Sequence, residues 1–206
     1  MVNIRQYHKS DELNWLDVHA SVMVDSSAWW IVLHKKPEYA SGKVVDLVAE
    51  ADGRIIGFIS IEVDSEIMKP ERDCGFVWEF GVHRDWRGRG VGWQLFTAAH
   101  REMLSEFGVR RSIWYSQEPR SQEWYQRVGM KEIDRHMQLS LLPTPEQKEM
   151  FKADGFACWR MRGSCAPEDF ERIQSKYTVI EDDDTLKPRL CIGYEYIWSG
   201  KDENQQ

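Results

Sequence analysis

An arginine- and glycine-rich turn lies near the middle of the 206-residue chain, between a predicted strand and a predicted helix. Residues 87–92 read Arg-Gly-Arg-Gly-Val-Gly, and the predicted helix runs from Gly90 to Phe107. The first amide groups of a helix lack intrahelical partners, and the helix dipole adds partial positive charge there. Glycines let phosphate oxygens approach the backbone, and Arg87 and Arg89 add charged, forked donors. The turn therefore predicts a phosphate-binding site.

Three other anion-binding patterns fit this turn poorly. No Gly-Lys-Ser/Thr closes it, so it is not a P-loop. The glycine spacing and the downstream carboxylate of a dinucleotide-binding fold are missing. The stretch is short and lies between a strand and a helix, unlike an RGG-type RNA-binding segment. A tight turn with solvated arginines is the remaining alternative.

Glu79 lies inside the strand predicted for residues 76–83, just before the turn. A buried carboxylate is costly without a role, so Glu79 is a candidate general base or amine-binding group. A carboxylate paired with solvent or with an arginine is the alternative. Strict alternation points Glu79 away from Trp78 and Phe80, but an interior glycine often marks a bulge. A bulge near Gly81 would re-aim the carboxylate.

The histidines and the cysteines give no sign of metal chemistry. The cysteines form neither a CxxC pair nor a Cys/His cluster with zinc spacing, which predicts free thiols and no bound metal. His83 is expected to cap a loop or face solvent, and His19 and His34 are expected at the surface. The four cysteines are Cys74, Cys158, Cys165 and Cys191.

Hydrophobic periodicity and turn residues predict strands alternating with helices. Hairpin neighbours and crossover helices both occur, which indicates an α/β protein with a mixed sheet. Strands are expected at residues 2–7, 43–50, 54–63, 76–83, 110–116, 130–142 and 189–198. Helices are expected at residues 10–22, 26–33, 90–107, 120–127, 144–151 and 167–177.

Composition excludes several classes of protein. A net charge of −7 argues against a general nucleic-acid binder, which needs a basic face. The polar N-terminus is not a signal peptide, and no apolar stretch approaches the length of a membrane span. The expectation is a cytoplasmic protein with no nucleic-acid or membrane partner. Ten tryptophans suggest an aromatic-lined pocket, with ordinary packing as the alternative.

Two motifs resemble those of the GCN5-related N-acetyltransferase (GNAT) superfamily. Arg87–Gly92 matches its Q/R-x-x-G-x-G/A motif, and Trp78–His83 resembles its fourth strand. Trp124–Met130 resembles its second signature, FYxxxGF. The resemblance implies the GNAT fold, which is α/β (α+β), with flanking helices and a mixed central sheet of about seven strands, splayed between the fourth and fifth. It also implies one domain over residues 1–206, with an insert at about 143–187.

The resemblance also assigns residues to the coenzyme. The pantetheine arm is expected to pair with the backbone of the fourth strand, and the pyrophosphate with the glycine-rich turn. Tyr125 matches the tyrosine that protonates the departing thiolate, for which an ordinary pKa of about 10 is suitable. The asparagine of the second motif is missing, and Ser121 or Gln122 is expected to replace its contact. The expected coenzyme-binding residues are Phe80, Gly81, Val82, Arg87, Gly88, Arg89, Gly90, Val91, Gly92, Ser121 and Tyr125.

The implied activity is direct acetyl transfer from acetyl-CoA, as co-substrate, to a primary amine of a small molecule. Acetylation of a protein N-terminus or lysine, and a non-catalytic CoA-binding sensor, are the alternatives. The catalytic residues are expected to be Tyr125 and Glu79. An aromatic pocket with Glu79 or Asp25 nearby would suit a cationic amine. The substrate-binding residues are expected to be Trp29, Trp30, Glu79 and Trp114, with Tyr39, Trp159 and Tyr194 as further pocket candidates. Many family members are dimers, which is the basis for expecting a homodimer.

Overall fold

The computed structural model describes the chain except for residues 28–30, 32, 67–71 and 201–206. Its contacts divide the chain into two compact units. The first unit comprises Met1–Trp114 and Glu195–Gln206, and the second comprises Tyr115–Tyr194. The organisation into a single domain stays a prediction.

The first unit is built on strands that follow one another as antiparallel neighbours, in the order β1-β2-β3-β4, with β5 beside β4 in parallel orientation. The fold class is therefore the predicted one, α/β with a mixed sheet. The hairpin between β2 and β3 turns at Asp52-Gly53, where both residues have positive φ. The strands are β1 (Asn3–Gln6), β2 (Val44–Ala51), β3 (Arg54–Val63), β4 (Cys74–Val82) and β5 (Arg111–Ser116), whose last residues lie in the second unit.

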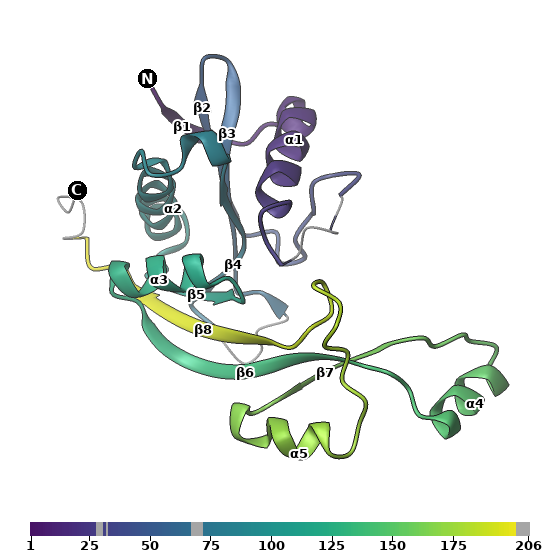
Figure 1. The fold of residues 1–206 in the computed structure, drawn as a ribbon. Coiled ribbons are helices and arrows are strands. Elements are labelled where there is room, and N and C mark those ends of the chain that lie inside the picture. Colours follow the sequence, from purple (N-terminus) through teal and green to yellow (C-terminus); the bar gives the residue numbers. More distant parts are fainter. Residues whose placement is uncertain (28–30, 32, 67–71, 201–206) are drawn as a thin grey trace. The chain divides into compact units, whose positions relative to one another are not determined.

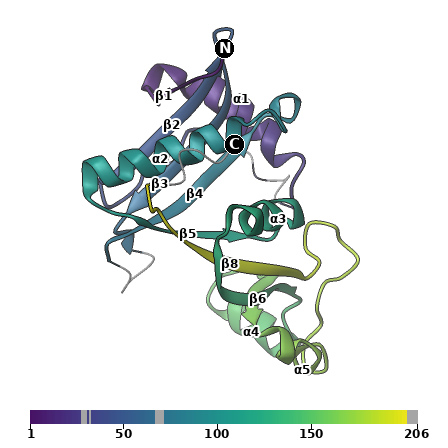
Figure 2. The same cartoon turned by 90° about the vertical axis from the view of Figure 1, so that its left-hand side faces the viewer.

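Two helices cover the two faces of these strands (Figure 1). On one face α1 (Glu12–Met23) buries Trp15 and Val18 against β2 and β3. On the other face lies α2 (Val91–Phe107), which crosses the strands in Figure 2 and buries an apolar stripe along its length. Short 3-10 turns precede the two helices at Lys9–Asp11 and Arg84–Trp86. Of the helix predicted at residues 26–33, residues 28–30 and 32 lie outside the described residues. The described residues 26, 27, 31 and 33 are not helical, so the prediction is wrong there.

A β-bulge interrupts the pairing of β3 with β4. Ser60 is opposite Glu79 and Ile61 is opposite Val77, so Trp78 is the extra residue. A bulge lets two successive side chains point to the same side. The predicted bulge thus exists, but at Trp78 instead of Gly81, which keeps a regular partner in Phe58. The bulge therefore alters the direction of side chains just before the glycine-rich turn.

The parallel pair β4 and β5 separates along its length. Pairing covers only Cys74–Phe76 of β4, opposite Arg111–Ile113 of β5. From Val77 onward β4 has no ladder partner in the described part of β5, which confirms the predicted splay between these strands. Along Val77–Val82, β4 therefore keeps its pairing with β3 and is no longer paired with β5.

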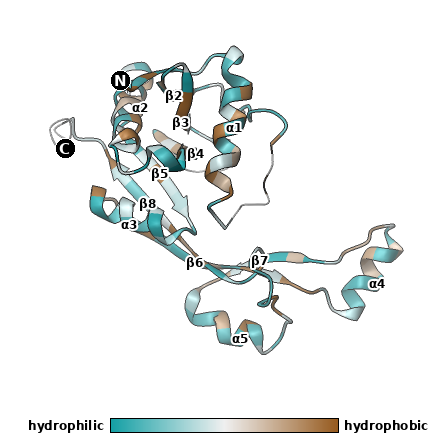
Figure 3. Cartoon of the chain, turned by 45° about the horizontal axis from the view of Figure 1, so that its top comes forward, coloured by the Kyte–Doolittle hydropathy of each residue, from teal (hydrophilic) through white to brown (hydrophobic). Residues whose placement is uncertain are grey.

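The second unit contains α3 and a sheet ordered β8-β6-β7. The insert predicted at about 143–187 contains a strand that the sequence analysis did not find, β7, which pairs antiparallel with β6. The described chain thus has eight strands instead of about seven. The helices α4 and α5 are coloured mainly hydrophilic in Figure 3, and neither buries a residue fully. The elements are α3 (Pro119–Val128), β6 (Lys131–Leu141), α4 (Pro145–Ala153), β7 (Met161–Cys165), a 3-10 turn (Pro167–Asp169), α5 (Phe170–Gln174) and β8 (Arg189–Ile197), which ends in the first unit.

No helix in the described ranges is long and apolar enough to cross a membrane. All four cysteines are free, as predicted.

Candidate active site

The turn after β4 leaves the start of α2 open. Gly90 is the N-cap residue with φ of 78°, and no side chain caps the helix. Gln94 N–H donates to Gly90 O at 3.0 Å, so the first intrahelical bond leaves the earlier amides to other partners. Gly88 also has positive φ, 73°, and a Cβ there would meet nothing within 4 Å. Uncapped amides, a helix dipole and free space fit a pyrophosphate.

Gly92 lies beside β4, unlike Gly88 and Gly90. A Cβ on Gly92 would make ordinary contacts, 3.4 Å from Phe80 Cζ and 3.7 Å from Val82 Cγ2. The role of all three glycines at a phosphate stays a prediction.

The arginines of the turn behave differently from one another. Arg87 Nε donates to Val82 O at 2.9 Å, and Arg87 Nη1 lies 2.9 Å from a carboxylate oxygen of Asp25. Arg84 pairs with the other oxygen of Asp25 at 3.2 Å. The Arg87 guanidinium thus ties the turn to the end of β4 and to the segment after α1. Arg89 lies over the Trp86 ring, with its guanidinium carbon 5.1 Å from the centroid, and so is the turn's less constrained cation.

The last residues of β4 alternate between the two helices. Phe80 faces α2, with its ring 5.5 Å from that of Trp114 in a perpendicular arrangement. Gly81 faces α1, where an added Cβ would lie 2.8 Å from Val22 Cγ1. Val82 and Phe80 both border Gly92, so the backbone expected to pair with pantetheine is continuous with the turn.

Glu79 points toward α1, where it meets His19. The distance from His19 Nε2 to Glu79 Oε2 is 3.4 Å, and the two side chains are 2% and 17% exposed. The expectation that His19 lies at the surface is therefore wrong. His19 occupies the inner face of α1 and stacks on Trp15 with ring centroids 4.9 Å apart. His34 is exposed, and His83 accepts a hydrogen bond from Asp85 N–H, as expected of a loop-capping residue.

Glu79 ends a row of polar side chains that crosses the sheet. Asp46, Ser60 and Glu79 are successive cross-strand neighbours on β2, β3 and β4. Ser60 Oγ donates to Asp46 at 2.9 Å, and Lys36 Nζ lies 2.5 Å from the other Asp46 oxygen. The row therefore runs from the Lys36–Asp46 ion pair to the Glu79 carboxylate next to His19.

One of the predicted pocket residues, Tyr39, lies next to the chain's own Lys36, together with two rings that were not predicted, Tyr7 and Trp15. Lys36 is buried, and its Nζ lies 4.8 Å from the ring centre of Tyr7, 5.4 Å from that of Trp15 and 5.3 Å from that of Tyr39. Burial raises the pKa of Tyr7 to about 12, so the phenol next to Lys36 carries no charge at neutral pH. These rings serve to hold the loop that carries Lys36. No sequence signal marked Lys36, because its partners come from distant segments.

The nearby Glu62 carboxylate is fully engaged. It accepts hydrogen bonds from Ser41 N–H and from Trp78 Nε1, both at 2.8 Å. Burial alone would raise the pKa of Glu62, but these donors lower it below the usual range. Trp78 also stacks on Tyr39 at 6.0 Å, so the bulge turns both Trp78 and Glu79 to the α1 face.

The tryptophans predicted to bind substrate are not gathered by the described structure. Trp29 and Trp30 lie outside the described residues. Trp114 is 1% exposed, and its Nε1 donates to Ser112 Oγ at 2.8 Å. Its ring also stacks on His100, so Trp114 is a core residue on the α2 side in this structure. Trp159 is exposed at the surface of the second unit.

Tyr125 is buried in the second unit. Its ring lies 5.3 Å from that of Tyr194 in a nearly perpendicular arrangement. Burial raises the pKa of Tyr125 well above the ordinary value expected from the sequence. The phenol therefore keeps its proton at neutral pH, but it is a weaker acid than the phenol with a pKa of about 10 that the sequence analysis expected for this role. Ser121 lies in the first turn of α3, and its hydroxyl has no partner among the described residues.

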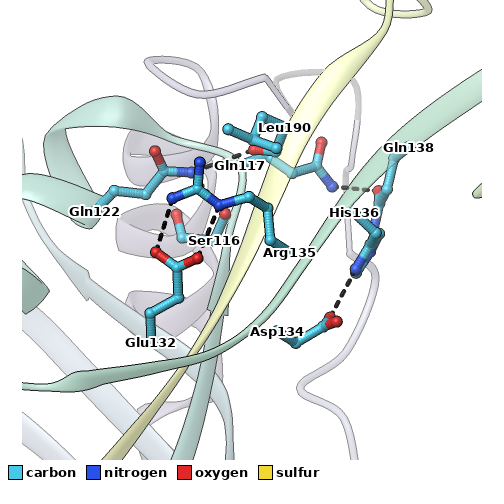
Figure 4. Close-up of polar contacts among 9 residues, drawn as sticks. All are labelled: Ser116, Gln117, Gln122, Glu132, Asp134, Arg135, His136, Gln138 and Leu190. Carbon is cyan, nitrogen blue, oxygen red and sulfur yellow. Dashed lines mark hydrogen bonds and ion pairs between the residues drawn. The ribbon is translucent and has the colours of Figure 1, made fainter. Parts of the chain in front are cut away.

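A polar network around α3 gives Gln122 a structural role (Figure 4). Its Nε2 donates to Ser116 O at 2.9 Å and to Leu190 O at 3.2 Å, so it joins the ends of β5 and β8. This amide is therefore engaged, which leaves Ser121 as the candidate for the missing asparagine. The same figure shows His136 Nδ1 beside Asp134 at 2.8 Å on β6, a pair that the sequence analysis did not single out.

Among the residues with described positions, no group of three or more His, Cys, Asp or Glu side chains could hold a metal ion.

Comparison with known proteins identifies a family from the sequence and a shared fold from the structure. The sequence profile of the acetyltransferase (GNAT) family matches residues 5–130, which is more than half of the chain. No curated protein matches the chain by sequence.

Three similar solved structures illustrate the structural match. An acetyltransferase of the GNAT family from Staphylococcus aureus Mu50 has 16% identity and a TM-score of 0.55, over 65% of this chain and 87% of that one. The PaiA N-acetyltransferase of Thermoplasma acidophilum, in complex with coenzyme A, has 16% identity and a TM-score of 0.53, over 65% and 92%. The ribosomal-protein-S18-alanine N-acetyltransferase of Escherichia coli has 12% identity and a TM-score of 0.56, over 100% and 99%. At these identities the likeness shows the fold.

Proposed function

Since the chain belongs to the acetyltransferase (GNAT) family, we propose that it transfers an acetyl group from acetyl-CoA to the primary amine of a small molecule. One observation carries the proposal. Strand β4 leaves β5 after Phe76, and its chain continues into the uncapped, glycine-opened start of α2. This arrangement offers strand backbone to an extended arm and helix amides to a pyrophosphate.

The residues of β4 and the turn have separate tasks in this reaction. Acetyl-CoA supplies the activated acyl group. The amides at Gly88–Gly92 bind the pyrophosphate, with Arg89 as the less constrained cation of the turn. The backbone of Phe80, Gly81 and Val82, in the stretch of β4 that has left β5, orients the arm, and the Val82 N–H is suited to stabilise an oxyanion. Positioning thus accounts for most of the catalysis.

Glu79 and Tyr125 move the protons. Glu79 takes a proton from the acceptor's ammonium, because only a neutral amine can attack a carbonyl. Tyr125 gives a proton to the departing thiolate, a role that rests on the match of its motif. A cytoplasmic location, expected from the sequence, and a homodimer, expected from the family resemblance, complete the proposal.

The test is thiol release from acetyl-CoA across a panel of polyamines, aminoglycosides and amino acids. The inactivating variant is Gly90→Glu, which puts a carboxylate where the pyrophosphate binds. The matched control is Gly108→Glu, at the other end of α2, because Gly108 also has positive φ (70°) and open space. Both substitutions impose similar backbone strain, so only the site at the helix start differs.

Release with an amine by the wild type and Gly108→Glu, and not by Gly90→Glu, supports the proposal. Coenzyme binding without release on any amine would point to a protein acceptor or a sensor, and peptide substrates would then separate these two. Failure of the wild type to bind acetyl-CoA would overturn the proposal.

A further inference from the structure

We propose that His19 is the positioning residue for Glu79, holding one carboxylate oxygen so that the other is aimed at the acceptor's ammonium. The inference rests on the proposed function. His19 Nε2 and Glu79 Oε2 are 3.4 Å apart, and both side chains lie on the α1 face of the sheet. His19 touches no reacting atom and acts through Glu79.

The proton between the two groups belongs on His19 Nε2. An ionised carboxylate has only acceptors, and a bare imidazole nitrogen facing it would repel it. The ring is 2% exposed and packed between Trp15 and Phe58, with centroids 4.9 Å and 5.8 Å away. Hydrogen on Nε2 is the arrangement in which the ring can face an ionised carboxylate without repulsion. Packing of the ring holds Nε2 at 3.4 Å from Glu79 Oε2.

Glu79 has fewer hydrogen-bond and ion-pair partners than the other two carboxylates of this face, Asp46 and Glu62. Asp46 is paired with Lys36 and accepts from Ser60, and Glu62 accepts from Ser41 and Trp78. Among the described residues, His19 is the one side chain within ion-pair distance of Glu79, and the Glu79 charge also acts on the Tyr39 phenol. One carboxylate oxygen thus remains open for a substrate. The titratable and charged groups on this face are His19, Lys36, Tyr39, Asp46 and Glu62.

Glu79 follows the bulge at Trp78 and lies within Val77–Val82, the stretch of β4 that has left β5. The next three residues are those proposed to orient the acyl donor. A carboxylate here is well placed to accept a proton from an amine that approaches the thioester.

The proton transfer balances without any change on His19. One N–H bond of the substrate ammonium breaks, and an O–H bond forms at the open oxygen of Glu79. The amine becomes neutral and its lone pair is free to attack. His19 keeps its Nε2 proton throughout, which separates a positioning role from a relay.

The experiment compares His19→Leu, which removes the donor, with His19→Gln, whose amide nitrogen can replace Nε2–H. The matched control is His34→Leu, the same substitution at an exposed position. Each folded variant is tested for acetyl-CoA affinity, for kcat and KM with the active amine, and for the pH profile of kcat/KM.

For His19→Leu we expect kcat to fall by about 10- to 100-fold, as for other groups that orient a catalytic residue. The acid limb of kcat/KM should move to higher pH, because the carboxylate loses a donor that favours its ionised form. Acetyl-CoA affinity should stay unchanged. His19→Gln should recover most of kcat and return the limb toward the wild-type position, and His34→Leu should match the wild type. A wild-type pH profile in His19→Leu, or no recovery in His19→Gln, would overturn the inference.

A second measurement does not depend on activity. Nitrogen-15 NMR of the wild type should show hydrogen on Nε2 of His19, and Glu79→Gln should shift that signal. If no amine is acetylated but this signal behaves as expected, the proposed function fails while the pairing stands. Hydrogen on Nδ1 alone would refute the pairing whatever the activity.

Discussion

Arg87 and Asp25 are joined by a 2.9 Å ion pair that links the glycine-rich turn to the segment following α1. The side chains are 27% and 30% exposed, and Arg87 also donates to Val82 O. The sequence analysis assigned the guanidinium to the pyrophosphate. In the structure the guanidinium also fixes the turn, so it contributes to local stability, and its contact with the pyrophosphate stays a prediction.

A double-mutant cycle of Arg87→Met and Asp25→Asn should measure this link. Each single variant loses the pair, so the double variant should lose less than their sum. We expect a coupling free energy of about 0.5–1 kcal/mol in urea unfolding, the upper range for partly exposed pairs. The same cycle on Arg172 and Asp169, which are 57% and 43% exposed, should give a smaller value. Equal coupling free energies would mean that the Arg87–Asp25 pair stabilises the fold no more than an ordinary surface pair does.

Gly81→Ala should destabilise the first unit through crowding. Its Cβ would lie 2.8 Å from Val22 Cγ1 and 2.9 Å from Phe58 Cζ. Overpacking of this kind costs about 1–3 kcal/mol. Adding Val22→Ala should recover part of the loss in chemical unfolding, because it removes the closest atoms. Gly163→Ala is the control, since its Cβ would be in ordinary contact at 3.7 Å. Strictly additive losses would contradict the crowding explanation.

Lys36→Met should be among the most destabilising single substitutions in the first unit. Removing the ammonium leaves the Asp46 carboxylate, 20% exposed, without its cation. Breaking a buried pair from one side costs about 3 kcal/mol or more. Lys36→Met with Asp46→Asn should recover much of this stability in urea unfolding. Lys43→Met, at a pair that is 53% and 29% exposed, should cost less than about 1 kcal/mol. A loss in the double variant equal to that of Lys36→Met would disprove the pairing argument.

Local patterns were enough to predict most of the elements around the site. The stripe at Leu95, Phe96, Ala99 and Met103 specified α2, and Gly108 ended it, because these signals act within a few residues. The splay of β4 from β5 came from the family resemblance and is confirmed by the pairing.

Partners distant in the chain could not be predicted in the same way. Arg87 meets Asp25 across 62 residues, and Lys36 meets rings from β1's end, α1 and its own loop. Alternation alone could not show that Trp78, rather than Gly81, is the bulged residue. Likewise, one face of α1 buries His19, although a histidine in that pattern reads equally well as exposed. Each of these facts depends on tertiary packing.

Acid should weaken the anchor between β1 and the start of α1. Asp11 accepts two hydrogen bonds from the Arg5 guanidinium, at 2.7 Å and 3.0 Å, and this pairing lowers its pKa. Because the folded pKa lies below the unfolded value of about 3.9, the stabilisation is complete above that value. It is lost as the pH falls through the lower, folded pKa. Asp11→Asn should therefore flatten the acid side of the stability curve between pH 5 and 2, measured by thermal unfolding. The control is Asp17→Asn, at an exposed position of α1, which should leave the curve unchanged. If the loss of stability at low pH persists in Asp11→Asn, other carboxylates cause that loss.

Tyr125→Phe should slow turnover while leaving the fold and coenzyme affinity intact. The substitution keeps the ring that packs at 5.3 Å from Tyr194 and removes only the hydroxyl. If that hydroxyl protonates the thiolate, kcat should fall by about 100-fold or more, as for other positioned general acids. Burial raises the pKa of Tyr125, so the wild type should show no loss of kcat from this residue as the pH rises from 7 to 10. The matched control is Tyr177→Phe, at an exposed tyrosine of the same unit, which should keep wild-type kcat. A Tyr125→Phe variant that loses acetyl-CoA affinity and stability together would make Tyr125 a packing residue, because a proton donor is needed in the transition state and not for binding.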